Sequence, residues 1–113
     1  MLSRQDIMKI VDALCQGIAV LFPQERIEAI LFGSYARGDA EPGSDIDVLL
    51  LVNAPRQDIS EKSWQVGELA AELLMAYGIV VSPIVENRDY FNSNAELFPL
   101  YRSIRAEGVR LVA

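Results

Sequence analysis

The sequence predicts an α+β fold, an α/β sandwich in which a small sheet is covered by helices. Helical and strand-like apolar patterns alternate along the chain in the order helix, strand, short helix, strand, helix, strand, helix. No internal repeat or low-complexity run interrupts this order. The chain has 113 residues, of which 51% are hydrophobic, so we expect one domain over residues 1–113 that can bury a core.

The first helix is expected after Ser3, which together with Asp6 forms a capping pattern. The residues that follow form one apolar stripe at helical spacing: Ile7, Ile10, Val11, Leu14, Ile18 and Leu21. Pro23 helps to end this helix. Residues 26–34 (RIEAILFGS) then predict a short strand that ends in a Gly-Ser turn, and residues 35–38 predict the first turn of a short helix.

The longest strand-like run is DIDVLLLV at residues 45–52. It is apolar on both faces beyond its two acids, which predicts a central strand. Asp58 or Ser60 is expected to cap the next helix, which ends at Gly78. The apolar stripe of that helix consists of Val66, Leu69, Ala70, Leu73 and Tyr77.

The last third of the chain predicts one more strand and one more helix. Residues 79–85 are expected to form a strand, with Pro83 marking a sheet edge or a bulge. Residues 87–94 predict a polar loop. Pro99 suits the first turn of a final helix, which Gly108 can terminate.

Composition excludes several classes of function. The chain has no histidine and a single cysteine, which excludes Cys/His zinc sites, histidine general bases and an internal disulfide. Its net charge of −6 argues against binding long nucleic acid. No apolar run approaches the ~18 residues that span a bilayer, and no secretion signal follows Met1. We therefore expect a cytoplasmic protein that uses carboxylates, hydroxyls and backbone groups and binds no membrane.

Asp45 and Asp47 interrupt an otherwise apolar strand. Residues i and i+2 of a strand point to the same face, so the two carboxylates are expected to lie close together. Because two ionised carboxylates repel, either one of them is protonated or a cation lies between them. Oxygen ligands favour Mg²⁺ or Mn²⁺. The alternative is a solvated strand end, in which Asp45 caps the preceding turn and Asp47 faces water.

Gly33 and Ser34 follow a strand and open a helix. Backbone N–H groups at such a turn are unpaired and can hold a phosphate, and glycine lets the backbone approach the anion closely. By itself this pattern is usually only a tight turn. Combined with the paired carboxylates on the neighbouring strand, it describes a site for a nucleoside triphosphate and its magnesium.

Gly33-Ser34, ten further residues and Asp45-Ile46-Asp47 resemble the GS-x10-DxD signature of the DNA polymerase beta superfamily of nucleotidyltransferases. The run GSYARGDAEPGSDIDVLLLV resembles the minimal nucleotidyltransferase (MNT) members of that superfamily. The resemblance implies the nucleotidyltransferase fold, a small mixed sheet flanked by helices. It also implies transfer of AMP from ATP to a hydroxyl group.

Roles for individual residues follow from the same resemblance. Gly33 and Ser34 would hold the β- and γ-phosphates, and Asp45 and Asp47 would bind two metal ions. Arg37 would offset phosphate charge or form an ion pair with Asp39, Asp45 or Asp47. Arg4 and Arg102 are further candidates for contacts with the phosphates.

The resemblance also implies a partner. Several small members are antitoxins that bind a helical HEPN-type RNase toxin and modify it on tyrosine, so a HEPN-type toxin is the expected partner, and a homo-oligomer stays open. Catalytic members supply a third carboxylate from the next strand, where this chain has Ser82 and no acid. Glu86 follows that strand, where it either reaches back or faces solvent. Two functions therefore stay open: AMP transfer to a toxin, or a non-catalytic antitoxin with a degenerate nucleotide site.

Overall fold

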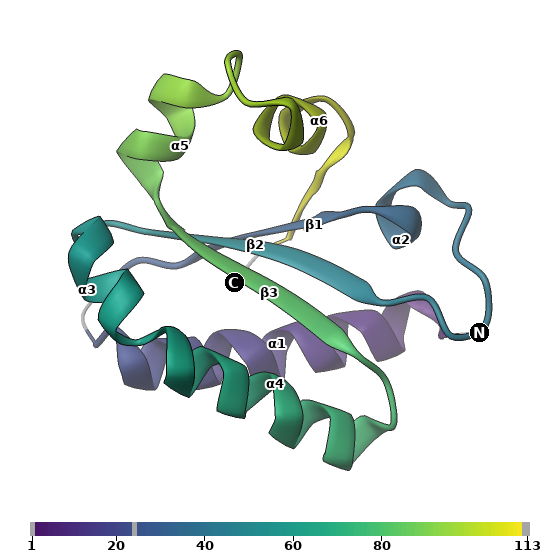
Figure 1. Cartoon of the computed structure of the whole chain (residues 1–113). Helices are drawn as coiled ribbons and strands as arrows, with labels where there is room; N and C mark the ends of the chain where they lie inside the picture. The colour runs from purple at the N-terminus through teal and green to yellow at the C-terminus, as the bar shows by residue number, and fades with distance from the viewer. Residues whose placement is uncertain (1, 24, 112–113) are drawn as a thin grey trace.

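The computed structural model of the chain describes residues 2–23 and 25–111. Its elements follow one another in the order shown in Figure 1: α1 (Arg4–Leu21), β1 (Glu28–Phe32), α2 (Ser34–Arg37), β2 (Ile46–Val52), α3 (Arg56–Glu61), α4 (Ser63–Tyr77), β3 (Val81–Asn87), α5 (Arg88–Asn94), α6 (Pro99–Glu107) and β4 (Val109–Leu111). Within the described ranges, no helix combines the length and the apolar character needed to cross a membrane.

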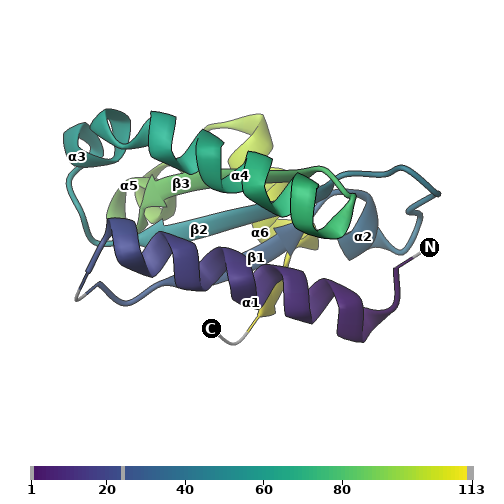
Figure 2. The ribbon, with the colours of Figure 1, turned by 90° about the horizontal axis from the view of Figure 1, so that it is seen from below.

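The four strands form one mixed sheet in the order β3-β2-β1-β4. Strand β2 runs parallel to β3, and β1 runs antiparallel to both β2 and β4. Helices α1 and α4 lie side by side on one face, and α5 and α6 lie on the other (Figures 1 and 2). The expected α+β sandwich is confirmed. So are the central place of β2 and the edge position of the strand that contains Pro83.

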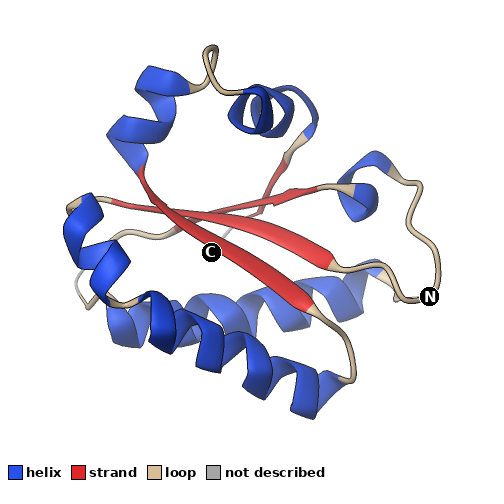
Figure 3. Cartoon of the chain, in the orientation of Figure 1, coloured by secondary structure: helices blue, strands red, loops and turns tan. Residues whose placement is uncertain are grey.

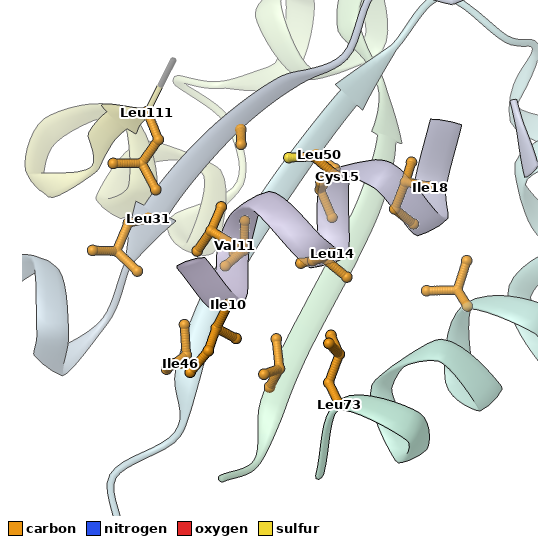
Figure 4. Packing of buried hydrophobic residues seen from close by; sticks show 14 of the residues in the cluster. Ile10, Val11, Leu14, Cys15, Ile18, Leu31, Ile46, Leu50, Leu73 and Leu111 are labelled. Carbon is orange, nitrogen blue, oxygen red and sulfur yellow. The ribbon is translucent and has the colours of Figure 1, made fainter. Parts of the chain in front are cut away.

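Apolar side chains fill both sides of the sheet. The larger cluster lies between the sheet and helices α1 and α4 (Figure 4), and from β2 it contains Ile46, Val48, Leu50 and Val52. The smaller cluster lies under α5 and α6 and contains Ile30, Leu49, Leu51, Phe91 and Ile104. Because side chains alternate along a strand, Asp47 shares the face of Leu49 and Leu51. The two acids of the DID run therefore belong to the α5/α6 face.

Helix boundaries follow local capping signals where these are strong. Ser3 and Asp6 form a complete capping box at the start of α1. Gly78, in the left-handed region at φ 70°, ends α4, and Gly108 ends α6. These expected boundaries are confirmed.

Other boundary predictions are wrong. Asp58 and Ser60 do not cap α4, because both lie inside the separate short helix α3. The third strand runs from Val81 to Asn87 and is shifted from the expected residues 79–85. The region predicted as a polar loop contains α5 (Figure 3), which starts where the Asn87 side chain accepts a hydrogen bond from the Tyr90 N–H. Strand β4 was not expected at all.

Candidate functional site

The candidate site lies at one end of the sheet, where β1 ends and where β2 and β3 begin (Figure 1). The strand register pairs Phe32 of β1 with Asp47 of β2, and Asp47 with Ser82 of β3. The Gly33-Ser34 turn follows Phe32 directly. Three segments that are separate in the sequence, the Gly-Ser turn, the aspartate pair and Ser82, thus meet at this end of the sheet.

The two aspartates differ in burial and influence each other. Asp45 is exposed and lies just before β2. Asp47 is half-buried and is the second residue of β2. Partial burial and the negative charge of Asp45 raise the pKa of Asp47 above the ordinary value of 3.8, and the positive charge of Arg37 opposes this shift. The preceding turn is closed by the Ser44 hydroxyl, which accepts from the Glu41 N–H at 2.9 Å. The negative charge of Asp45 thus disfavours the ionised form of Asp47, as expected for neighbouring carboxylates.

Gly33 has a conformation and a contact that only glycine accommodates. Its φ is +75°, and a Cβ added to it would lie 2.3 Å from Oδ2 of Asp47. The backbone of the turn thus presses directly against the carboxylate. Hydrogen bonds within α2 begin with the N–H groups of Ala36 and Arg37, which donate to the Gly33 carbonyl. The N–H groups of Ser34 and Tyr35 precede them, at the positions that a helix leaves without internal acceptors.

Arg37 forms ion pairs with acids outside the aspartate pair. Its Nε lies 3.2 Å from Oδ2 of Asp39, and its Nη1 lies 3.8 Å from Oε2 of Glu107. The guanidinium is about half exposed, at 46%, and its charge still acts on Asp47. Of the expected pairings for Arg37, the structure contains the one with Asp39.

Arg4 and Arg102 lie on different elements. Arg4 begins α1 and lines a hollow with Met8, Leu31 and Tyr35 on the α1 side of the sheet, opposite the face of Asp47. Arg102 is exposed on α6, which covers the same face as the aspartates. The structure therefore separates Arg4 from the aspartate pair.

Ser82 stands beside Asp47, at the position where the resemblance leads one to expect a third acid. It is half-buried. Side chains that are paired across parallel strands point to the same face, so the Ser82 hydroxyl and the Asp47 carboxylate share the α5/α6 face. Strand β3 therefore contributes a neutral hydroxyl at the position where the family resemblance predicts a carboxylate.

The expectation that Glu86 reaches back to the site or faces solvent is wrong. Glu86 belongs to β3 and pairs with Leu51 in the register, four residues beyond Ser82, which is about 13 Å along a strand. Its side chain is only 7% exposed. It accepts hydrogen bonds from Arg56 at 3.1 and 3.4 Å, from the Tyr101 hydroxyl and from the Asn87 N–H. Glu86 is therefore fully engaged in holding elements together.

The network around Glu86 was not anticipated. It joins α3 through Arg56 and α6 through Tyr101, and the Arg56 guanidinium lies 3.6 Å above the ring of Tyr90. Burial and the bond to Glu86 raise the pKa of Tyr101, so its phenol stays protonated and donates. In the sequence, the only feature that pointed to this network was an acid, Glu86, at the end of an apolar strand.

The acids at the site can hold a metal ion only with help from a ligand. Across residues 2–23 and 25–111, no three histidine, cysteine or acidic side chains converge closely enough to form a metal site. Asp45 and Asp47 offer carboxylate oxygens, and phosphate oxygens can complete the coordination of a hard divalent cation. The Gly33 backbone contacts the Asp47 carboxylate, so an anion bound by the N–H groups of Ser34 and Tyr35 in the same turn would lie next to the aspartate pair.

Comparison with known proteins places this geometry in a family. The sequence profile of the nucleotidyltransferase domain matches residues 7–107 of the chain. MJ0604 of Methanocaldococcus jannaschii, named as a protein adenylyltransferase, is 38% identical over 79 residues, which cover 70% of this chain and 71% of MJ0604. MJ0141 of the same organism, with the same kind of name, is 35% identical over 80 residues, which cover 71% of this chain and 79% of MJ0141.

Solved structures with the same fold include two toxin–antitoxin complexes. A toxin–antitoxin crystal structure with AMP-PNP aligns with a TM-score of 0.59 and 22% identity, covering 90% of this chain and 72% of that one. A mutant of the toxin–antitoxin MntA–HpeT aligns with a TM-score of 0.55 and 23% identity, covering 100% of this chain and 74% of that one. At these identities the likeness shows a shared fold.

Proposed function

The chain belongs to the family of nucleotidyltransferase domains, and on that premise we propose that it is an antitoxin that transfers AMP from ATP to a hydroxyl group of its toxin. The observation that carries this proposal is the contact between the Gly33 backbone and the Asp47 carboxylate, with Asp45 beside it. This contact puts the turn that would bind phosphate directly beside the carboxylates that would bind a divalent cation.

In this proposal the site residues have separate tasks. Asp45 and Asp47 bind Mg²⁺, or Mn²⁺, together with the triphosphate of ATP. The Gly33-Ser34 turn receives the phosphates through its backbone N–H groups and the Ser34 hydroxyl. Arg37 adds positive charge next to them while Asp39 and Glu107 hold it in place. A bound divalent ion supplies charge neutralisation on the phosphates as pyrophosphate leaves.

The raised pKa of Asp47 supports the assignment of a cation to the aspartate pair. A half-buried carboxylate next to another carboxylate is electrostatically unfavourable in the metal-free protein. A divalent cation between the two removes this repulsion. The donor set contains only oxygen, which suits Mg²⁺ or Mn²⁺.

Names of similar proteins support the choice of acceptor and partner. Both M. jannaschii relatives are named as protein adenylyltransferases, and two proteins of the same fold come from toxin–antitoxin complexes, one of them with AMP-PNP. The partner proposed here is a HEPN-type toxin in the cytoplasm, and the acceptor is a tyrosine hydroxyl. In the transfer, the acceptor oxygen bonds to the α-phosphorus, the bond from that phosphorus to the bridging oxygen breaks, and pyrophosphate departs.

A second function rests on Ser82 and Glu86. Ser82 is neutral and Glu86 is engaged about 13 Å away along the strand. The described part of the chain therefore brings no third carboxylate to Asp45 and Asp47 that could take the proton of the acceptor hydroxyl. An antitoxin that inhibits its toxin by binding alone, with a degenerate nucleotide site, is the corresponding alternative.

The two functions are separated by one experiment. The purified chain is incubated with Mg²⁺ and α-labelled ATP, with and without the HEPN-type protein encoded next to it, and both proteins are weighed by mass spectrometry. A gain of AMP on the partner, absent with Asp45→Asn/Asp47→Asn, is the result expected for transfer. Tight complex formation without any AMP gain would contradict transfer and favour inhibition by binding.

A further inference from the structure

We infer that this site holds one divalent ion per bound nucleotide, not two, and that Ser82 is the residue that sets this number. The inference rests on the proposed nucleotide site and concerns its metal content. It follows from counting the ligands that each element presents around Asp47.

One ion fits the residues that are present. Magnesium requires octahedral coordination at about 2.0–2.1 Å and is commonly bound through one or two carboxylates plus substrate phosphates. Asp45 and Asp47 supply the carboxylates; they lie on either side of Ile46 at the start of β2, so they point to the same face of the sheet. Together with the phosphates of a nucleotide next to Gly33, they complete the set for one ion.

A second ion finds no anchor of its own. Paired metal ions in phosphoryl-transfer sites lie about 3.5–4 Å apart, and each needs ligands that fix it. On the β1 side the register partner of Asp47 is Phe32, and the residue after it, Gly33, contacts the Asp47 carboxylate; neither has a side chain that can bind a metal ion. On the β3 side the neighbour is Ser82, whose neutral hydroxyl is a weak ligand for magnesium. A second ion would have to share the oxygens that already bind the first.

Other acids near this end of the sheet are engaged elsewhere. Asp39 and Glu107 form ion pairs with Arg37. Glu86 lies toward the opposite end of β3 and is bonded to Arg56 and Tyr101. In the part of the chain that the structure describes, three acidic side chains do not gather at any point. Among the described residues, the position beside Asp47 on β3, where a further carboxylate could bind a second ion, is therefore filled by Ser82.

A single ion has a consequence for the reaction. An ion held with the triphosphate by Asp45 and Asp47 would neutralise charge on the leaving pyrophosphate, and no second ion would be present to lower the pKa of the acceptor hydroxyl. When the acceptor oxygen bonds to the α-phosphorus, its proton then passes to water or to a base of the acceptor protein. Proton removal would thus rely on a group that the described part of this chain does not supply.

Counting bound metal tests the inference without any measurement of transfer. The full chain is dialysed to equilibrium against Mn²⁺ and AMP-PNP, and the retained manganese and nucleotide are quantified. We expect one Mn²⁺ per retained AMP-PNP in the wild type and two in Ser82→Asp, where a carboxylate stands beside Asp47. Ser82→Asn, of the same size but neutral, is expected to keep the ratio of one.

Each result of the metal count bears on the inference or on the proposed function. Two ions per nucleotide in the wild type, or a ratio of one in folded Ser82→Asp, would overturn the inference and leave the proposed function standing. Failure of the wild type to retain AMP-PNP would overturn the proposed nucleotide site, and the inference with it. Circular dichroism and thermal unfolding check the fold of both variants. If Ser82→Asp does not fold, the ratio in the wild type still decides the question.

Discussion

The two ends of strands β2 and β3 carry carboxylates on the same face of the sheet but use them in opposite ways. At one end, Asp45 and Asp47 form no hydrogen bond or ion pair with any side chain among the described residues. At the other end, Glu86 accepts bonds from a guanidinium, a phenol and a backbone N–H. The carboxylates at the first end, which we call the ligand end, are available to bind a ligand. The carboxylate at the second end, which we call the structural end, is already paired within the protein.

The difference lies in what the neighbouring elements bring to each end. Near Glu86, α3 contributes Arg56 and α6 contributes Tyr101, so the buried charge is paired as buried charges must be. Near Asp47, β1 contributes Phe32, the turn after β1 contributes Gly33, and β3 contributes Ser82. An acid that is partly buried and left unpaired by its own chain is a candidate for function, whereas an acid that is buried and paired is a candidate for stability.

Removing both aspartate charges should produce the largest effect on function. For Asp45→Asn/Asp47→Asn we expect AMP transfer to fall by at least about 100-fold, because the cation and the phosphates lose their carboxylate ligands. The fold should persist, since neither side chain forms a hydrogen bond or ion pair within residues 2–23 and 25–111. Labelled-AMP incorporation and thermal unfolding measure the two results.

A matched variant controls for net charge. Asp12→Asn/Asp58→Asn removes the same two charges from exposed positions on α1 and α3 and should leave transfer within about twofold of the wild type, because neither residue lies at this end of the sheet. Full transfer by the Asp45/Asp47 variant would refute the metal assignment.

Substitution of Gly33 tests the contact that defines the ligand end. Gly33→Ala places a Cβ 2.3 Å from Oδ2 of Asp47 at a φ of +75°. We expect a loss of about 1–3 kcal/mol of stability, because φ 75° with ψ −154° is a backbone conformation that is essentially restricted to glycine. We also expect weaker binding of AMP-PNP with Mn²⁺, because the Asp47 carboxylate must move. Chemical denaturation and equilibrium dialysis measure these effects.

Gly38→Ala separates the two causes. Gly38 has a similar φ of +83°, but an added Cβ would meet no heavy atom within 4 Å. It should cost a similar amount of stability, about 1–2 kcal/mol, without changing nucleotide affinity. Equal loss of nucleotide affinity in both variants would show that general strain, and not the contact with Asp47, is responsible.

Substitution at the structural end should give the reverse pattern. Glu86→Ala leaves the partly buried hydroxyl of Tyr101 without its acceptor, so we expect a loss of about 1–3 kcal/mol in the free energy of unfolding. The ratio of Mn²⁺ to AMP-PNP should not change, because Glu86 lies about 13 Å along the strand from Ser82. Urea denaturation and dialysis test both statements.

The control is a surface acid. Glu96 pairs with Arg105 at 3.6 Å but is 75% exposed, and exposed ion pairs contribute about 0–1 kcal/mol. Glu96→Ala should therefore be much milder than Glu86→Ala. A change of metal ratio in Glu86→Ala would mean that the two ends of the strands are coupled and that our separation of them is wrong.

Local signals explain which parts of this comparison the sequence could predict. The capping box of α1, the buried run of β2 and the spacing between Gly33 and Asp47 depend on residues that are close in sequence or on one strand. They predicted the layers and the segments of the ligand end. The position of Ser82, as the counterpart of a third acid, came from the family resemblance, and the register of β2 and β3 puts it beside Asp47.

The remaining features depend on distant contacts. Strand β4 has only three residues and is defined by pairing with β1, where Leu111 meets Ala29. Helix α5 has a polar sequence typical of a loop, and it is stabilised by its Asn87 cap and by burial of Phe91. The partners of Glu86 lie 30 and 15 residues away along the chain. The residues close to Glu86 in the sequence do not indicate that it pairs with Arg56 and Tyr101, so the structural end of the strands could not be predicted.

The smallest expected effect concerns pH and the unpaired state of Asp47. Burial and the charge of Asp45 raise the Asp47 pKa above 3.8, so its ionised form is disfavoured in the folded, metal-free chain. A carboxyl with a raised folded pKa contributes stability below its unfolded pKa and loses it as the pH rises through the folded pKa. Asp47→Asn should therefore raise the Tm of the metal-free protein by a few degrees at most at pH 7. This gain should fade as the pH falls toward 3.8, and thermal unfolding across that range measures it. A lower Tm for Asp47→Asn at pH 7 would mean that the chain itself stabilises this charge, as it does that of Glu86, and the contrast between the two ends would fail.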